Sequence, residues 1–176
     1  MNLTIDYLKS CSKIHFFGLG FIQVKLNDSV RYHFYCPDLP QFTDSPHDHR
    51  YWFVSTVLRG SLRNKIWEID PSEGGRPKIQ RYDSCGSGEA PPRLTCEVQA
   101  KVRTEFVVQE GSQYFIPADV FHQVMAVSLP CITMIQRGPK EKKFARILED
   151  FDTVPVCPFS KVLEEHILWD HVRSCL

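Results

Sequence analysis

Hydrophobic and polar positions alternate in short runs along most of the chain, and this pattern predicts β-strands. Apolar and aromatic residues dominate 21–26 and 30–36, and Asn27-Asp28-Ser29 between them is a turn sequence. Gly60, Gly111, Pro117 and Pro130 are expected to end or separate runs. Further strands are expected at 47–58, 65–69, 78–82, 94–108, 113–116, 123–127 and 131–136. Short strands at this spacing predict an all-β sandwich or barrel.

Helical patterns occur near the two ends of the chain, at 3–12 and 160–175. The second is the stronger, because five apolar residues share one face: Val162, Leu163, Ile167, Leu168 and Val172. That face is expected to pack on the barrel or to form a contact in a homodimer. The expected organisation is an N-terminal helical segment, one β-barrel and a C-terminal helical extension packing on it, at 1–15, 16–140 and 141–176.

Composition narrows the class of protein. The 176 residues are 43% hydrophobic, with 21 basic and 21 acidic side chains, which is typical of one globular domain. Zero net charge argues against nucleic-acid binding. No apolar run is long enough for a membrane span, and the N-terminal sequence does not resemble a secretory signal. Seven widely spaced cysteines without a CxxC pair indicate reduced thiols, so we expect a cytoplasmic protein.

Three histidines form the strongest candidate site. His47 and His49 are two positions apart, so a strand would project both side chains from the same face. His122 follows a predicted strand and turn that can place its side chain opposite the first pair. Three neutral imidazoles suit Fe, Zn, Cu or Ni. The sequence therefore predicts a three-histidine metal site inside the barrel.

These histidines lie in two segments, 47–60 and 111–126, which together resemble the two motifs of the cupin superfamily. Six of nine motif positions match: His47, His49, Gly60, Gly111, Pro117 and His122. Three positions depart from the motifs, namely Phe53 for Glu, Asp119 for Gly and Ala126 for Asn. The resemblance implies a single cupin (jelly-roll) β-barrel with short flanking helices.

Phe53 stands where many cupins have a fourth, carboxylate ligand. A three-histidine site of this kind resembles that of the thiol dioxygenases, among them cysteine dioxygenase. The resemblance implies Fe(II) as the cofactor, with dioxygen and a small thiol or related metabolite as substrates. Two alternatives stay open: a non-catalytic or sensing cupin that binds a small ligand, and a zinc-dependent hydrolase or isomerase.

Strand parity also gives candidates for substrate contacts. If His49 faces inward, so does Tyr51, and Arg31 and Tyr35 share one face of the strand at 30–36. We therefore name Arg31, Tyr35 and Tyr51 as candidate catalytic residues. His33 lies on the same strand face, but we expect it to be a solvent-facing polar residue. The loop at 83–93 has no helical or strand period and is a candidate lid over the barrel mouth.

Overall fold

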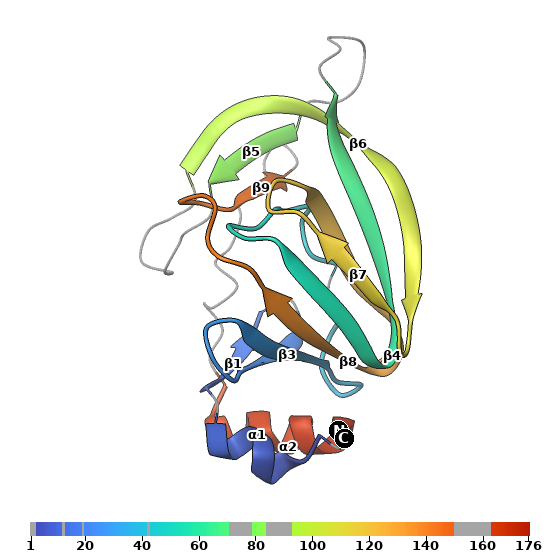
Figure 1. Cartoon of the computed structure of the whole chain (residues 1–176). Coiled ribbons are helices and arrows are strands. Elements are labelled where there is room, and N and C mark those ends of the chain that lie inside the picture. Colours follow the sequence, from blue (N-terminus) through green and yellow to red (C-terminus); the bar gives the residue numbers. More distant parts are fainter. Residues whose placement is uncertain are drawn as a thin grey trace.

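A computed structural model of the chain describes these residues: 3–11, 13–18, 20–41, 43–70, 79–83, 93–149 and 163–176. The described part consists of an antiparallel β-sheet with two helices beside one end of it (Figure 1). The strands are β1 Lys13–Phe17, β2 Phe21–Lys25, β3 Val30–Tyr35, β4 Phe53–Asp70, β5 Ile79–Asp83, β6 Arg93–Gln109, β7 Gln113–Ile116, β8 Phe121–Arg137 and β9 Arg146–Glu149. The helices are α1 Ile5–Cys11 and α2 Glu165–Cys175.

Two long strands, β4 and β8, belong to both halves of the sheet. The order of neighbouring strands is β1-β2-β3-β8-β4-β6-β5-β9, and β7 pairs with β4. The first half of β4 pairs with β7 and with the second half of β8, whereas its second half pairs with β6 and with the first half of β8. The sheet can therefore curl back on itself, and the expected all-β, jelly-roll fold with short flanking helices is confirmed.

The sheet is not a fully closed barrel. Among the described residues, β8 and β9 are joined through isolated bridges that His47 makes to His122 and Ile147. The His47 N–H donates to the His122 carbonyl at 2.9 Å, and Leu148 N–H donates to the Pro46 carbonyl at 2.8 Å. Pro46 has no N–H to extend this ladder, so a longer strand cannot form there.

Gly60 and Pro130 bend the two long strands and do not end them. This corrects the expected stops at both positions, because β4 and β8 run through them. The β4–β8 register shifts around Gly60, whose φ is +76°. A Cβ there would lie 2.7 Å from the carbonyl oxygens of Ser128 and Pro130, so the close crossing requires glycine.

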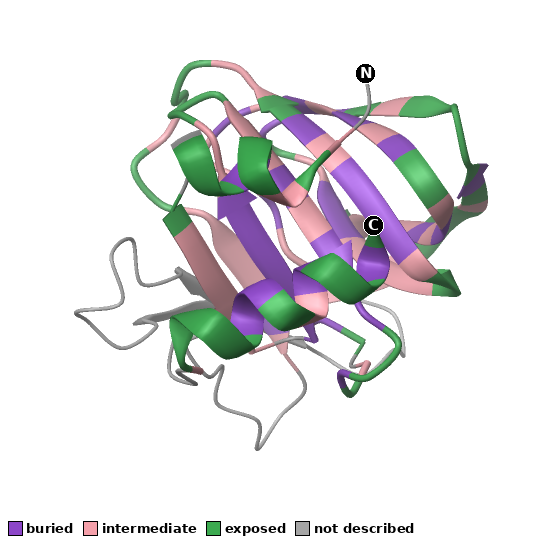
Figure 2. Cartoon of the chain, turned by 90° about the horizontal axis from the view of Figure 1, so that it is seen from below, coloured by how far each residue is buried: buried purple, intermediate pink, exposed green. Residues whose placement is uncertain are grey.

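The helices cover the outer face of β1–β3 (Figures 1 and 2). Leu168, Trp169 and Val172 of α2 are buried there against Phe34 of β3. The sheet extends beyond the expected 16–140 on both sides, because β1 begins at Lys13 and β9 lies at Arg146–Glu149. Periodicity could not reveal the four-residue β9, which is in the sheet through backbone pairing with β5.

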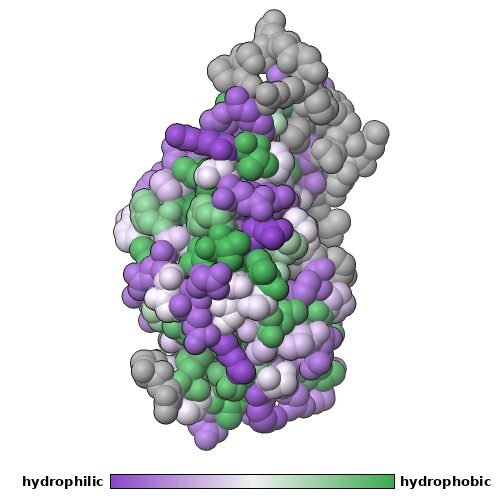
Figure 3. Space-filling model, turned by 90° about the vertical axis from the view of Figure 1, so that its right-hand side faces the viewer, coloured by the Kyte–Doolittle hydropathy of each residue, from purple (hydrophilic) through white to green (hydrophobic). Residues whose placement is uncertain are grey.

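On the side shown in Figure 3, hydrophobic groups are interspersed with hydrophilic ones. No helix in the described part of the chain is long and apolar enough to cross a membrane. Residues 150–162 and the centre of the 83–93 loop lie outside the described residues.

Candidate metal centre

The structure brings the three predicted histidines together. His47 and His49 lie in the segment before β4, and His122 is the second residue of β8. The predicted strand at 47–58 begins only at Phe53, so the first pair comes from a connecting segment tied to β8 by backbone hydrogen bonds. One potential ligand nitrogen from each histidine lies within 4.8 Å of the others. The predicted cluster of metal-ligating side chains is therefore present.

The three imidazole rings form a nearly equilateral arrangement. Their centroids are 4.9, 4.9 and 5.0 Å apart. The Nε2 atoms of His49 and His122 approach to 2.8 Å. Two nitrogens bound to one ion at about 2.0–2.1 Å lie about 2.9–3.4 Å apart for bond angles between square and tetrahedral. The separation of this one pair is close to that range, and His47 has a potential ligand nitrogen within 4.8 Å of both.

Hydrogen bonds on the outer side orient two of the rings. The Nδ1 atom of His47 lies 2.9 Å from the Ser45 carbonyl, which can only accept. The Nδ1 atom of His122 lies 3.4 Å from the Asn64 amide oxygen, a longer contact in which the oxygen is again the acceptor. Both arrangements place the proton on Nδ1 and leave the Nε2 lone pair free for a metal ion, as outer partners of ligating histidines do.

The environment of His49 and His122 favours their uncharged forms. Burial lowers the pKa of His49 well below its usual 6.5, and the other two histidines, Arg31 and His33 lower it further. Burial also lowers the pKa of His122 well below 6.5, with a smaller contribution from His47. A metal ion requires the deprotonated imidazole. Near neutral pH, the His49 and His122 imidazoles are therefore already in the state that can bind a metal.

Phe53 fills the position where a fourth ligand is expected by the resemblance. Its ring is 4% exposed and lies edge-on to His49, with centroids 4.9 Å apart, and 5.5 Å from His122. An aromatic ring cannot ligate these metals. The donor set that this region offers is consequently three imidazoles.

Asp48, between the two ligands, points away from the cluster. Its buried carboxylate accepts hydrogen bonds from Lys142 Nζ, from the Arg146 backbone N–H and, at 2.6 Å, from Arg146 Nε. These contacts tie the histidine segment to the start of β9. Asp48 therefore holds the segment in place without contacting a metal.

The other predicted site residues divide into two groups. Tyr51 stacks near His49, with centroids 5.7 Å apart, and its hydroxyl accepts a hydrogen bond from Arg31 Nη2. These two candidates therefore adjoin the cluster. Tyr35 lies in a core group with Phe21 and Cys131, and burial raises its pKa well above 10. No contact between Tyr35 and the three histidines is present in the described part of the chain.

His33 is inside the barrel, which corrects the expectation that it faces solvent. Its Nε2 lies 3.2 Å from the Gln23 amide nitrogen, and its ring lies 4.6 Å from that of Phe21.

The sequence analysis did not identify Asn64 as a site residue. Counting alternate positions from Phe53 places Asn64 outside, but the register shift at Gly60 reverses the parity and turns its side chain toward His122.

The sequence matches no known protein-family model and no curated protein. Solved structures similar in fold include a hydroquinone 1,2-dioxygenase, PnpCD, in complex with Cd²⁺ and 4-hydroxybenzonitrile, at 16% identity and a TM-score of 0.41, covering 78% of this chain and 72% of that chain. An RmlC-like cupin from Shewanella frigidimarina matches at 14% and 0.35, covering 75% and 88%. An oxalate oxidase in complex with glycolate matches at 17% and 0.35, covering 88% and 57%. Similarity at this level leaves the function to be argued from the site.

Proposed function

We propose that this chain is a cupin oxygenase in which His47, His49 and His122 hold Fe(II), and that it oxidises a small thiol with dioxygen. The observation that supports this most directly is the donor set. Three mutually facing imidazoles lie together, and an aromatic ring stands in the place of a carboxylate. Three neutral ligands leave the charge of a divalent ion uncompensated, which favours an anionic co-ligand such as a thiolate.

Bound Fe(II) would supply the redox chemistry that adds both atoms of dioxygen to the thiolate sulfur, giving a sulfinate. The chain's own residues set the surroundings of that reaction. Phe53 excludes water from one side of the cluster, and Asn64 and the Ser45 carbonyl hold two of the rings. We propose Tyr51 and Arg31 as substrate-contacting groups, because Arg31 binds the Tyr51 hydroxyl beside His49. Tyr35, in the core, has no role in this proposal.

A non-catalytic cupin is the second candidate. The 2.8 Å contact between His49 and His122 permits one shared proton, so the cluster can exist as a hydrogen-bonded pair without a metal. Such a protein would bind a small ligand and consume no dioxygen. Metal content and oxygen consumption separate the two candidates.

The test is metal analysis of the purified chain, before and after anaerobic Fe(II) addition, followed by oxygen-electrode assays. The assays use three small thiols: an amine thiol, a carboxylate thiol and an amino-acid thiol. We expect one iron per chain and thiol-dependent oxygen uptake, both lost in His49→Ala. His166→Ala, on an exposed position of α2, is the control and should change neither.

Other outcomes redirect the conclusion. Zinc in place of iron, without oxygen uptake, supports the hydrolase or isomerase alternative. No bound metal, even after anaerobic Fe(II) addition, contradicts the catalytic site and leaves the ligand-binding cupin.

A further inference from the structure

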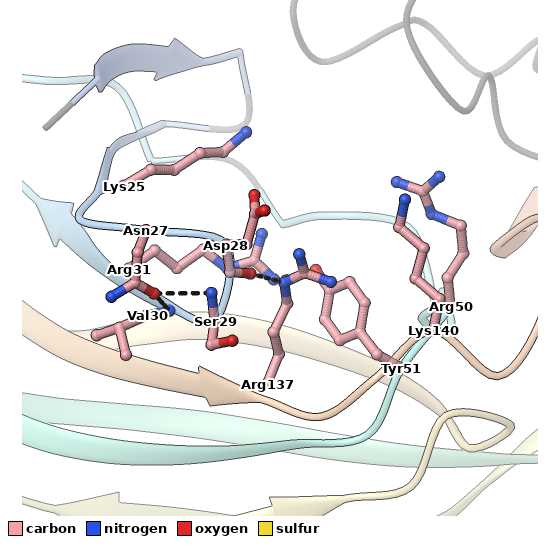
Figure 4. Close-up of a pocket in the computed structure, with 10 residues that line it drawn as sticks. All are labelled: Lys25, Asn27, Asp28, Ser29, Val30, Arg31, Arg50, Tyr51, Arg137 and Lys140. Carbon is pink, nitrogen blue, oxygen red and sulfur yellow. Dashed lines mark hydrogen bonds between the residues drawn. The ribbon is translucent and has the colours of Figure 1, made fainter.

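A cationic cavity lies beside the histidine cluster. It encloses about 150 Å³ between the β2–β3 turn, the end of β8 and the segment that follows the histidines (Figure 4). We call it the basic pocket, after five of its lining residues: Lys25, Arg31, Arg50, Arg137 and Lys140. Asp28 is the single carboxylate in the lining. The whole chain has as many acidic as basic side chains, so this excess of positive charge is local.

Strand pairing forces some of these cations together. Lys25 of β2 lies directly opposite Lys13 of β1 on one side and Arg31 of β3 on the other. Like charges at directly opposed positions destabilise a sheet. Burial lowers the pKa of Lys25, and the nearby Arg31 and Arg137 lower it further. The sequence thus maintains a repulsive arrangement that an anion would relieve.

The two arginines that contact Tyr51 have unused hydrogen-bonding capacity. Arg31 donates to the Tyr51 hydroxyl, but its buried Nε has no hydrogen-bond partner among the residues that the structure describes. Arg137 Nε donates to the backbone carbonyl of Asp28. Both guanidinium groups lie over the Tyr51 ring, at 5.2 and 4.8 Å from its centroid. Within the described part of the chain, none of the five cations forms an ion pair with a carboxylate.

We propose that the basic pocket binds a doubly charged oxyanion of the phosphate type, carried by a small ligand. One carboxylate would need one arginine fork, whereas five cations match a group with more charge and more acceptor oxygens. A cavity of about 150 Å³ accommodates a molecule of the size of benzene, which is room for one such group and not for a large ligand.

The position of Tyr51 connects the basic pocket with the metal cluster. Its ring lies 5.2 and 4.8 Å from the guanidinium groups of Arg31 and Arg137, and 5.7 Å from the His49 ring. This inference therefore deepens the proposed function and rests on it for one step. The anion is the part of the substrate that is held one aromatic ring away from the reacting end.

The test uses the full-length, metal-free protein and inorganic phosphate, with binding measured by isothermal titration calorimetry in a low-salt buffer. We expect one phosphate per chain and clearly weaker binding of acetate. Removing one charged hydrogen bond, as in Arg137→Gln, should weaken phosphate binding about tenfold or more. The double variant Arg50→Gln/Lys140→Gln should weaken it to a similar extent and decides the matter if Arg137→Gln fails to fold.

The matched control is Arg103→Gln, which removes a cation that is 71% exposed on β6, outside the pocket lining. It should leave phosphate affinity unchanged. The proposal is overturned if the wild type does not bind phosphate, if acetate binds as tightly, or if Arg103→Gln weakens binding as much as the pocket variants.

Because no metal is present in this titration, its failure and the failure of the proposed function are distinguishable. Phosphate binding by a chain that binds no iron supports the anion site and contradicts the oxygenase. Iron binding and thiol oxidation without phosphate binding contradict the anion site alone.

Discussion

The histidine cluster and the basic pocket share one short segment, residues 47–51, but they differ in how they hold charge. Burial keeps His49 and His122 neutral. Arg31 and Arg137 cannot lose their charge in a protein, and no carboxylate pairs with them among the described residues. One site offers lone pairs to a cation, and the other offers N–H donors to an anion. Residues 47–51 contribute His47 and His49 to the first site and Arg50 and Tyr51 to the second.

Among the variants that distinguish the histidine cluster from the basic pocket, His122→Ala is expected to have the largest effect, a loss of metal affinity. Loss of an outer partner of a metal ligand costs about 10–100-fold in affinity, so loss of the ligand itself should cost more than about 100-fold. Competition with a chelating metal indicator measures this. Phosphate affinity of the metal-free variant should be unchanged. A matching fall in phosphate affinity would mean that the two sites are one.

Asp48→Ala tests a second contrast, between paired and unpaired cations. Lys142 and Arg146 share the buried Asp48 carboxylate, whereas the cations of the basic pocket pair with no carboxylate in the described ranges of the chain. Removing one partner of a buried pair costs about 3–5 kcal/mol, but these two cations are partly exposed and can rehydrate, so we expect about 2–3 kcal/mol. Urea unfolding measures the loss.

The control for Asp48→Ala is Asp170→Ala, in an exposed pair with Arg173, which should cost at most about 1 kcal/mol. Equal losses in the two variants would show that Asp48 does not anchor the segment.

Asn64→Ala should weaken metal binding and cost a small amount of stability. The 3.4 Å contact to His122 Nδ1 is long, so we expect the low end of the range for an outer partner, about tenfold in metal affinity. Asn64 is fully buried, and its truncation leaves the His122 Nδ1–H without this acceptor, so we expect a loss of about 1 kcal/mol of stability, the low end of the range for a lost buried partner. Asn64→Asp keeps an acceptor and should retain metal affinity. Equal affinity in all three proteins would remove Asn64 from the site.

Asn64 also shows where sequence reasoning stops. The motif spacing located all three histidines, because it depends only on residue identity and separation. The alternation rule failed at Gly60, because a register shift changes which side chains face inward. Phe53 and Leu62 are both buried, although an uninterrupted strand would place them on opposite faces.

The prediction that Gly60 and Pro130 end strands was wrong for a related reason. Gly60 and Pro130 are turn residues by composition, but here they lie opposite one another where β4 and β8 bend. Glycine and proline are tolerated at bulges as well as at turns. The basic pocket was invisible because its cations come from four separate segments and cancel in the net charge.

The smallest expected effect concerns His33, on the same strand as Arg31 of the basic pocket. Burial lowers its pKa well below the usual 6.5, and Arg31 lowers it further. Below about pH 6.5 the unfolded chain binds a proton at this residue that the folded chain does not, so stability falls with decreasing pH by up to about 1.4 kcal/mol per pH unit. His33→Gln should remove this contribution and make the pH dependence shallower.

His49 and His122 contribute with the same sign as His33, because their pKa values are also lowered. Asp44 opposes them, because burial raises its pKa to about 6 and the folded state then binds the extra proton. The decisive quantity is therefore the difference in the free energy of unfolding between His33→Gln and the wild type. It is measured by urea unfolding at a series of pH values below 6.5. His166→Gln on the exposed side of α2 should follow the wild type. If the stability of His33→Gln has the same pH dependence as that of the wild type, the fold does not hold His33 neutral. The neutral state would then be a property of the histidine cluster and not of the wider interior.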